Sequence, residues 1–248
     1  MAESEKKILV ILPGWGGSQE TWKDFQEYIQ ADFASVLVID LPCFGSEPCP
    51  ADVWGVEEYA AFVEKKLKGI GSPDSLILLG HSFGGQVATY LVGTKQNVCN
   101  KLILVGAAVF RQRRSAKHFA FYLVAKAGKF FFKLPGFQLI QRQAKKILYR
   151  LANAPDYLQT SGVQREIFQK VVRQDVSDLA RKISVPTALI WGDRDTYVPL
   201  RQGKKLRSYI PQAKFAIIHG GKHGLHHTHT DELRKQILSF VYPNTYAF

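Results

Sequence analysis

The chain is poor in cysteine and in long apolar runs, and these absences narrow the class of protein. Three cysteines are too few, and odd in number, for the disulfide framework of a small secreted domain. No apolar run has the roughly 20 residues that a membrane-spanning helix needs, and the polar start of the sequence does not resemble a secretion signal. We therefore expect a cytoplasmic protein, although Cys43 and Cys49 could pair if the protein were exported.

Acidic residues are missing from one long stretch of the chain. None lies between Asp74 and Asp156, whereas thirteen lysines and arginines do, most of them between Arg111 and Arg150. The formal net charge of the whole chain is +12. We expect the stretch to form a cationic surface, and a charge run without a partner motif is more often solvated than bound.

Short apolar runs alternate with amphipathic stretches of helical length, a pattern typical of a parallel sheet with helices on both faces. The sequence predicts strands at residues 8–12, 36–39, 76–79, 102–105, 187–191 and 215–218. It predicts helices at about residues 21–29, 56–67, 83–92, 200–209 and 231–241, with Ser18 capping the first. Because no clean strand run lies between residues 109 and 184, that stretch is predicted to be a helical insertion.

The third apolar run leads directly into Gly-His-Ser-Phe-Gly at residues 80–84, followed by small residues that suit a helix. A G-x-S-x-G motif between a strand and a helix is typical of a tight turn that strains the serine backbone and exposes its hydroxyl. Gly80 and Gly84 are expected where strand and helix leave no room for a Cβ atom. Ser82 is therefore a candidate nucleophile, although the five residues alone also fit a loop of another α/β protein.

A serine nucleophile needs a base, and the base needs an acid that orients it. On a sheet of this kind the three follow in the order serine, acid, histidine, each after a strand. Asp193 and Asp195 follow the fifth predicted strand, and His223 follows the sixth. All three elements of a catalytic triad are thus present in the required order.

With these elements in place, the chain resembles the α/β-hydrolase superfamily over essentially its whole length. That superfamily typically carries G-x-x-D-x-x-V-P after the penultimate strand and G-x-x-H after the last, and both patterns occur here. The resemblance implies Asp195 as the acid and His223 as the base, with Asp193 as the competing acid that otherwise stabilises the loop. It also implies an oxyanion hole formed by the backbone N–H groups of Phe83 and Trp15.

The resemblance implies an α/β-hydrolase fold: a six-stranded parallel sheet that begins at Ile8, flanked by helices. Residues 1–108 and 185–248 would form this core, and residues 109–184 would form an inserted helical cap over the site. One departure is Pro13, which stands where the superfamily usually has a histidine, so the usual anchoring of the oxyanion loop is in doubt.

The implied function is that of a carboxylesterase-like serine hydrolase, which cleaves an ester through an acyl-enzyme on Ser82 and needs no cofactor. Similar-looking relatives cleave thioesters, amides or C–C bonds next to a carbonyl, and a non-catalytic ligand-binding protein of the same fold is the alternative from another class. A small ester or acyl compound is the expected substrate. The cationic cap, which also carries many aromatic residues, could meet an anionic membrane surface or an acyl carrier. No recognition motif for nucleic acid accompanies it.

Five histidines lie between His219 and His229 and suggest a metal site. Their spacing is crowded, however, and no cysteine or glutamate completes a recognisable ligand set. We therefore expect no metal.

Overall fold

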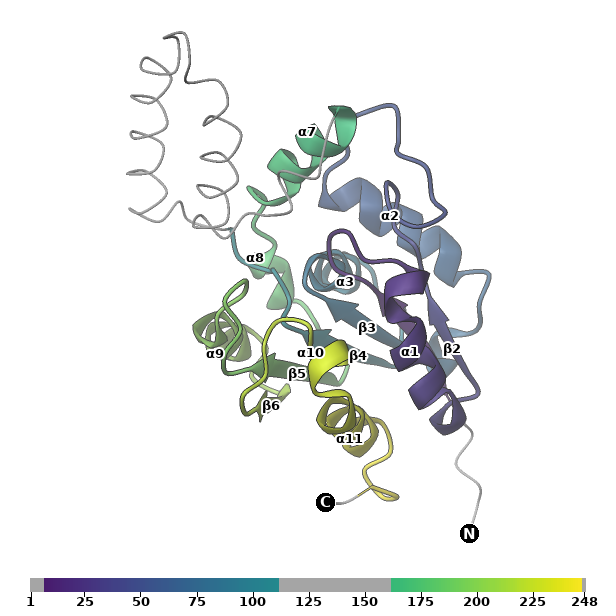
Figure 1. Cartoon of the computed structure of the whole chain (residues 1–248), viewed down its shortest axis with the longest axis vertical. Coiled ribbons are helices and arrows are strands. Elements are labelled where there is room, and N and C mark those ends of the chain that lie inside the picture. Colours follow the sequence, from purple (N-terminus) through teal and green to yellow (C-terminus); the bar gives the residue numbers. More distant parts are fainter. Residues whose placement is uncertain (1–6, 112–161, 247–248) are drawn as a thin grey trace, which may run out of the picture.

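The computed structural model of the chain describes residues 7–111 and 162–246. Six parallel strands form one sheet in the order β2-β1-β3-β4-β5-β6 (Figure 1). The strands are β1 (Ile8–Leu12), β2 (Ser35–Val38), β3 (Leu76–His81), β4 (Lys101–Val105), β5 (Thr187–Gly192) and β6 (Lys214–Ile218). The expected sheet is confirmed, and the largest difference is that β3 continues through Gly80 and His81.

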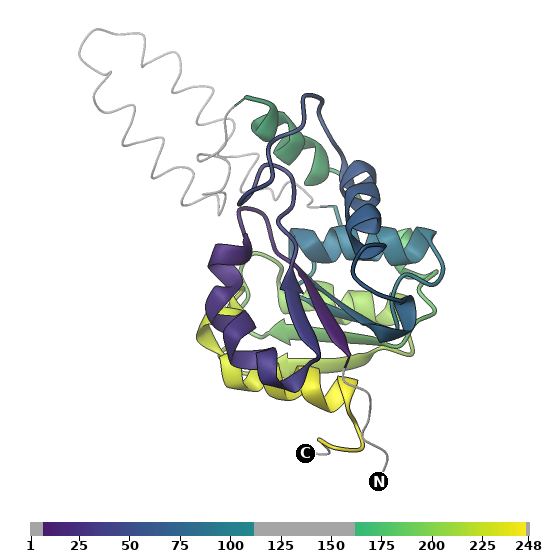
Figure 2. The same ribbon diagram turned by 90° about the vertical axis from the view of Figure 1, so that its right-hand side faces the viewer.

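Side chains of each strand alternate between the two faces of the sheet, so every strand contributes to two apolar cores. Leu9 and Ile11 of β1 lie in one core, whereas Val10 and Leu12 lie in the other. The first core is covered by α1 (Gln19–Ile29), α10 (Leu225–Thr228) and α11 (Thr230–Val241) (Figure 2). The second is covered by α2 (Val56–Leu67), α3 (Phe83–Thr94), α7 (Gly162–Val171), α8 (Ser177–Ala180) and α9 (Leu200–Tyr209).

Two helices, α2 and α9, begin and end where the sequence pattern predicts. Helix α1 begins two residues earlier than predicted because Ser18 and Thr21 cap it reciprocally, each side chain bonding the other residue's backbone N–H. Helix α10 was not predicted, since four residues are too few to show a helical period. Two short 3-10 helices, η1 (Gln30–Asp32) and η2 (Pro73–Ser75), complete the described elements.

Part of the expected cap falls on residues 112–161, outside the described residues, and most of the cationic and aromatic stretch lies there. The described remainder contains α7 and α8 and is hydrogen-bonded to the core. The buried side chain of Gln86 on α3 donates to the carbonyl oxygens of Val171 and Gln174, both at 3.2 Å. The side-chain oxygen of Gln174 in turn accepts the N–H of Val56, at the start of α2, at 2.9 Å. The division into core and cap stays a prediction.

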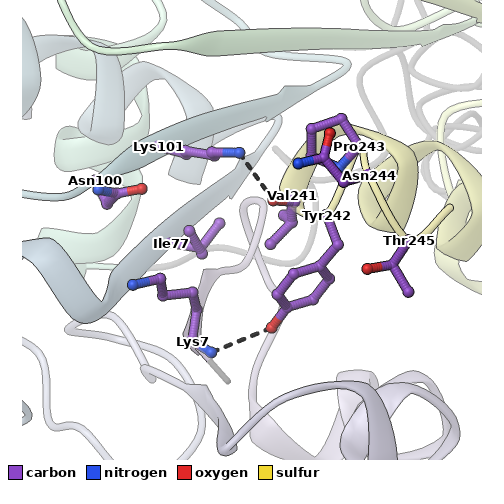
Figure 3. A pocket seen from close by; sticks show the side chains of 9 residues that line it. All are labelled: Lys7, Ile77, Asn100, Lys101, Val241, Tyr242, Pro243, Asn244 and Thr245. Atoms are coloured by element: carbon purple, nitrogen blue, oxygen red, sulfur yellow. Dashed lines mark hydrogen bonds between the residues drawn. The ribbon is translucent and has the colours of Figure 1, made fainter. Parts of the chain in front are cut away.

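A cavity of about 320 Å³ lies at the amino-terminal edge of the sheet, beside the end of α11 (Figure 3). Lys101, the first residue of β4, donates from Nζ to the carbonyl oxygens of Phe240 and Val241 at 2.9 and 2.8 Å. Burial lowers the pKa of Lys101. The backbone N–H of Lys7 donates to the Tyr242 hydroxyl at 3.1 Å. These contacts hold the last helix against the sheet, at the edge opposite to the carboxyl ends of the strands.

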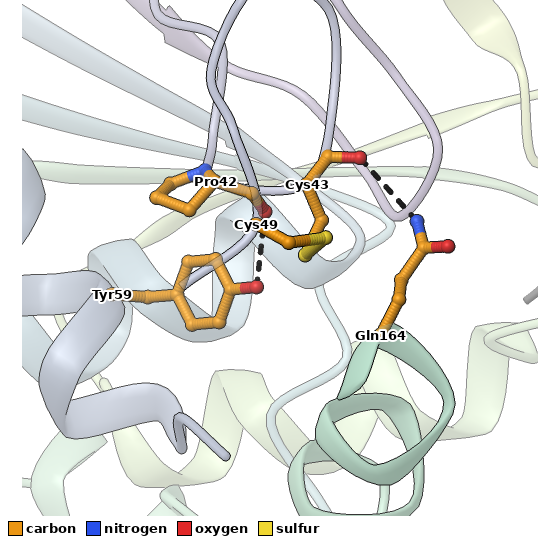
Figure 4. Close-up of a disulfide and its surroundings, with 5 residues drawn as sticks. All are labelled: Pro42, Cys43, Cys49, Tyr59 and Gln164. Atoms are coloured by element: carbon orange, nitrogen blue, oxygen red, sulfur yellow. Dashed lines mark hydrogen bonds between the residues drawn. A yellow bond between two sulfur atoms is a disulfide. The ribbon is translucent and has the colours of Figure 1, made fainter. Parts of the chain in front are cut away.

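A disulfide joins Cys43 and Cys49 in the loop between β2 and α2 (Figure 4). Cys99 is a buried free thiol. The loop is also held from both sides. The Tyr59 hydroxyl of α2 donates to the carbonyl oxygen of Pro42 at 3.1 Å, and the Gln164 side chain of α7 donates to that of Cys43 at 3.3 Å. The two cysteines whose pairing was left open are thus bonded, while the cytoplasmic location stays a prediction.

The disulfide should contribute about 2 kcal/mol to the free energy of unfolding, because it closes a short loop in the unfolded chain. We expect the double variant C43S/C49S to unfold at a correspondingly lower urea concentration, with an m-value that rises only slightly because the released loop is short. Dithiothreitol should destabilise the parent by the same amount and leave the double variant unaffected. If dithiothreitol left the urea midpoint of the parent unchanged, that result would contradict a stabilising disulfide between Cys43 and Cys49.

Candidate active site

Ser82 lies in the turn between β3 and α3, with a backbone φ of 51° and ψ of −113°. A positive φ is rare for a residue with a side chain, and here it places the hydroxyl at the amino end of a helix. A Cβ atom on Gly80 would lie 2.7 Å from the Gly84 carbonyl oxygen, where strand and helix meet. A Cβ atom on Gly84 would lie 2.1 Å from the carbonyl oxygen of Leu12, so the end of β1 is the obstacle there. Both positions accept only glycine.

Three side chains form one continuous hydrogen-bonded chain. Ser82 Oγ lies 2.9 Å from His223 Nε2, and His223 Nδ1 lies 2.7 Å from Asp195 Oδ2. The carboxylate is buried and its other oxygen accepts the backbone N–H groups of Tyr197 and Val198, each at 2.8 Å. Because the carboxylate can only accept, His223 Nδ1 carries a proton toward it and Nε2 is left to accept from the serine hydroxyl.

Asp193 lies apart from this chain. Its side chain contacts His219 Nδ1 at 3.1 Å and accepts the backbone N–H of Gly220 at 2.8 Å. The hydrogen bond with His219 holds the pKa of Asp193 below its usual value. Of the two candidate acids, therefore, Asp195 contacts His223, whereas Asp193 is hydrogen-bonded to the loop that follows β6.

Gly106, directly after β4, has a role that the sequence analysis missed. Strands β3, β5 and β6 bring Ser82, Asp195 and His223 to the same edge of the sheet, and β4 lies between β3 and β5. Gly106 has φ +52°, and a Cβ atom there would lie 3.2 Å from Asp195 Oδ2 and 3.4 Å from His223 Nδ1. A side chain at this position would press on the Asp–His pair. The only signal in the sequence is a glycine at the end of an apolar run.

The loop after β1 packs directly on the nucleophile turn. A Cβ atom on Gly14 would lie 3.1 Å from that of Ser82. The indole of Trp15 meets the rings of Phe44, Phe83 and Phe168 edge to face, with centroids 4.9, 5.5 and 4.9 Å away. The helix α7 thus places an aromatic side chain beside the loop. Phe83 is the first residue of α3, so its N–H has no partner within the helix.

Asp40, which the sequence analysis also missed, anchors two loops beside the site. The carboxylate accepts the backbone N–H of Gln19 at 2.7 Å, at the amino end of α1, and that of Ser46 at 2.9 Å. Its charge is favourable at a helix amino end. Gly45 leaves room for it, because a Cβ atom there would lie 2.2 Å from Asp40 Oδ2. Asp40 therefore couples the start of α1 to the loop that carries the disulfide.

Two buried histidines lie behind the site. Nε2 of His81 donates to the carbonyl oxygen of His223 at 3.0 Å, and burial holds the pKa of His81 well below its usual value. The ring of His226 stacks on Trp22 with centroids 3.8 Å apart. Burial lowers the pKa of His226 to about 3. Within residues 7–111 and 162–246 no group of three or more His, Cys, Asp or Glu side chains is placed to hold a metal ion.

His226 should make the fold sensitive to acid. Its pKa is about 3 in the folded protein and about 6.5 in the unfolded chain. The unfolded chain therefore binds the extra proton as the pH falls below about 6.5, and about 2 kcal/mol of stability should be lost between pH 7 and pH 5. We expect His226→Phe, which keeps a ring against Trp22, to lose less stability over that interval in urea titrations. Equal losses in variant and parent would show that His226 does not contribute.

The described part of the chain contains no helix that is both long and apolar enough to cross a membrane.

Comparisons with known proteins identify the family to which the chain belongs. A family described by its alpha/beta hydrolase fold matches residues 7–230. A pimeloyl-(acyl-carrier protein) methyl ester esterase of Neisseria meningitidis serogroup C is 26% identical, and the match covers 97% of this chain and 95% of that protein. A 2-hydroxy-6-oxononadienedioate/2-hydroxy-6-oxononatrienedioate hydrolase of Cupriavidus pinatubonensis is 21% identical, with 96% and 86% covered. Among solved structures, a bromoperoxidase from Bacillus anthracis has a TM-score of 0.71 at 20% identity, with 95% and 92% covered, and shares the fold. The chain belongs to the α/β-hydrolase family.

Proposed function

We propose that the protein is a serine hydrolase that cleaves a carboxylic ester through an acyl-enzyme on Ser82. The observation that carries the proposal is the unbroken contact from Ser82 Oγ through His223 to Asp195, at 2.9 and 2.7 Å. A structural serine has no need of a histidine that is itself oriented by a buried carboxylate. A non-catalytic binding protein of this fold would not require that arrangement.

In the proposed reaction His223 Nε2 takes the proton from Ser82 as Oγ attacks the ester carbonyl carbon. Asp195 stabilises the imidazolium that forms. The backbone N–H groups of Phe83 and Trp15 stabilise the negative charge that develops on the carbonyl oxygen. The imidazolium then protonates the leaving alcohol, and a water activated by the same histidine releases the acid and restores the serine.

The relatives favour an ester among the possible bonds. The Neisseria protein is named for the methyl ester of an acyl chain held on a carrier protein, and the aromatic side chains around Trp15 offer an apolar surface for an acyl chain. An ester of a small or carrier-bound acyl group is the proposed substrate. The Cupriavidus relative is named as a hydrolase of an oxo-dienedioate, a name that contains no ester or amide. Cleavage of a C–C bond next to a carbonyl is therefore the second candidate. A membrane surface gains no support from these relatives.

We also propose that residues 109–184 form a cap over the core of residues 1–108 and 185–248. The contact of Phe168 on α7 with Trp15 supports this, since it brings the described end of the insertion to the loop beside Ser82.

Two measurements test the function. A fluorophosphonate probe should label Ser82 and no other serine, as mapped by mass spectrometry of the digested protein. p-Nitrophenyl esters of increasing acyl length should be hydrolysed with a maximum that reports the depth of the acyl pocket. Thioesters and anilides with the same acyl groups test thioester and amide cleavage. A vinylogous diketone tests cleavage of a C–C bond next to a carbonyl. No labelling and no turnover of any of these would favour the binding-protein alternative.

A further inference from the structure

Tyr197 stacks on the face of His223 although it belongs to neither core. The two rings lie 5.0 Å apart between centroids, with 19° between their planes. The residue follows Asp195 by two positions, and its backbone N–H is one of the donors to the Asp195 carboxylate. The residue is 40% exposed, whereas the core aromatic residues are nearly inaccessible. A large ring held in solvent against the imidazole suggests a role in the site rather than in folding.

His223 also contacts a second ring, that of His81. The ring of His81 lies 4.8 Å away at 44°, and its Nε2 donates to the backbone carbonyl of His223. Burial holds the pKa of His81 well below its usual value. Among the described residues, the titratable groups that face His223 are the carboxylate of Asp195 after β5, the phenol of Tyr197 itself, and the imidazoles of His81 on β3 and of His226 on α10. Asp195 is the acidic one among them.

We propose that Tyr197 is a positioning residue for His223, holding the imidazole plane and stabilising the imidazolium with the face of its ring. The inference rests on the proposed function, in which His223 becomes positively charged as Ser82 attacks. An aromatic face carries partial negative charge and attracts a cation placed over it. The same stacking restricts rotation of the imidazole about the axis that points Nε2 at the serine.

The test compares Tyr197→Leu, which removes the aromatic face, with Tyr197→Phe, which keeps it. The pH dependence of the fluorophosphonate labelling rate is measured from pH 4.5 to 9, because that rate needs an uncharged His223 and requires no knowledge of the substrate. In the leucine variant the acid limb of the pH–rate profile should move to lower pH by about half a unit. The labelling rate on the plateau of the profile should fall about threefold. The phenylalanine variant should match the parent in both.

A nuclear magnetic resonance titration of the His223 ring protons provides a reading that does not depend on activity. Its midpoint should move down in the leucine variant and stay in place in the phenylalanine variant. An unchanged midpoint and limb in the leucine variant, or equal shifts in both variants, would overturn the inference. If the parent protein is never labelled at Ser82, the proposed function fails, and the titration alone still decides whether Tyr197 favours the charged ring.

Discussion

Replacing Ser82 by alanine should lower kcat for an ester substrate by about 10⁵- to 10⁶-fold and leave the thermal melting curve nearly unchanged. Oγ is the atom that would form the acyl-enzyme, so its removal eliminates the covalent route. Alanine keeps the Cβ atom of serine at φ 51°, and the turn between β3 and α3 therefore keeps its shape. The measurement is kcat with the best p-nitrophenyl ester, together with fluorophosphonate labelling.

The matched control is Ser208→Ala, which removes an exposed hydroxyl on α9 that donates to the carbonyl oxygen of Lys205. This variant should retain full activity and full labelling. Turnover that persists in a contaminant-free preparation of Ser82→Ala would refute the proposed mechanism. Loss of activity with a lowered melting temperature would instead indicate damage to the turn.

Replacing Asp195 by asparagine should lower kcat by about 10⁴-fold, whereas Asp193→Asn should cost less than about tenfold. The amide at residue 195 can donate to His223 Nδ1, which favours the imidazole tautomer with its proton on Nε2. That nitrogen could then no longer accept the proton of Ser82. Asp193 contacts His219 and Gly220 instead, so its substitution should affect mainly the loop.

Both variants should be assayed at several pH values and checked for melting temperature. A loss of activity that is equal in the two, or larger in Asp193→Asn, would reverse the assignment of the acid. Both substitutions are isosteric, and the melting temperatures separate a loss of folded protein from a loss of catalysis.

The six strands and the nucleophile turn could be predicted because their signals are local. A buried parallel strand is a short apolar run, and the alternation of such runs with amphipathic stretches is visible along the chain. The turn could be predicted from its two glycines. The crowding at Gly80 is local, because a Cβ atom there would meet the start of the following helix, whereas the obstacle at Gly84 is the end of β1 and became visible only in the structure.

Other features depend on segments that are remote in sequence. Gly106 matters because the Asp–His pair lies against it, and Asp40 matters because it receives donors from two loops. Tyr197 is an unremarkable loop residue until its ring is seen against His223. None of these contacts has a period or a motif, and His223 follows Gly106 by more than 100 positions.

The sequence by itself determined the order of the strands along the chain, the strained serine and the presence of an acid and a histidine after the right strands. Only the tertiary structure decided which acid reaches His223 and that Cys43 and Cys49 meet. The physical reason is the range of the interactions. Backbone sterics and apolar periodicity act between neighbours in the chain, whereas the hydrogen bonds of the site form only when the packed sheet brings the ends of β3, β5 and β6 to one edge.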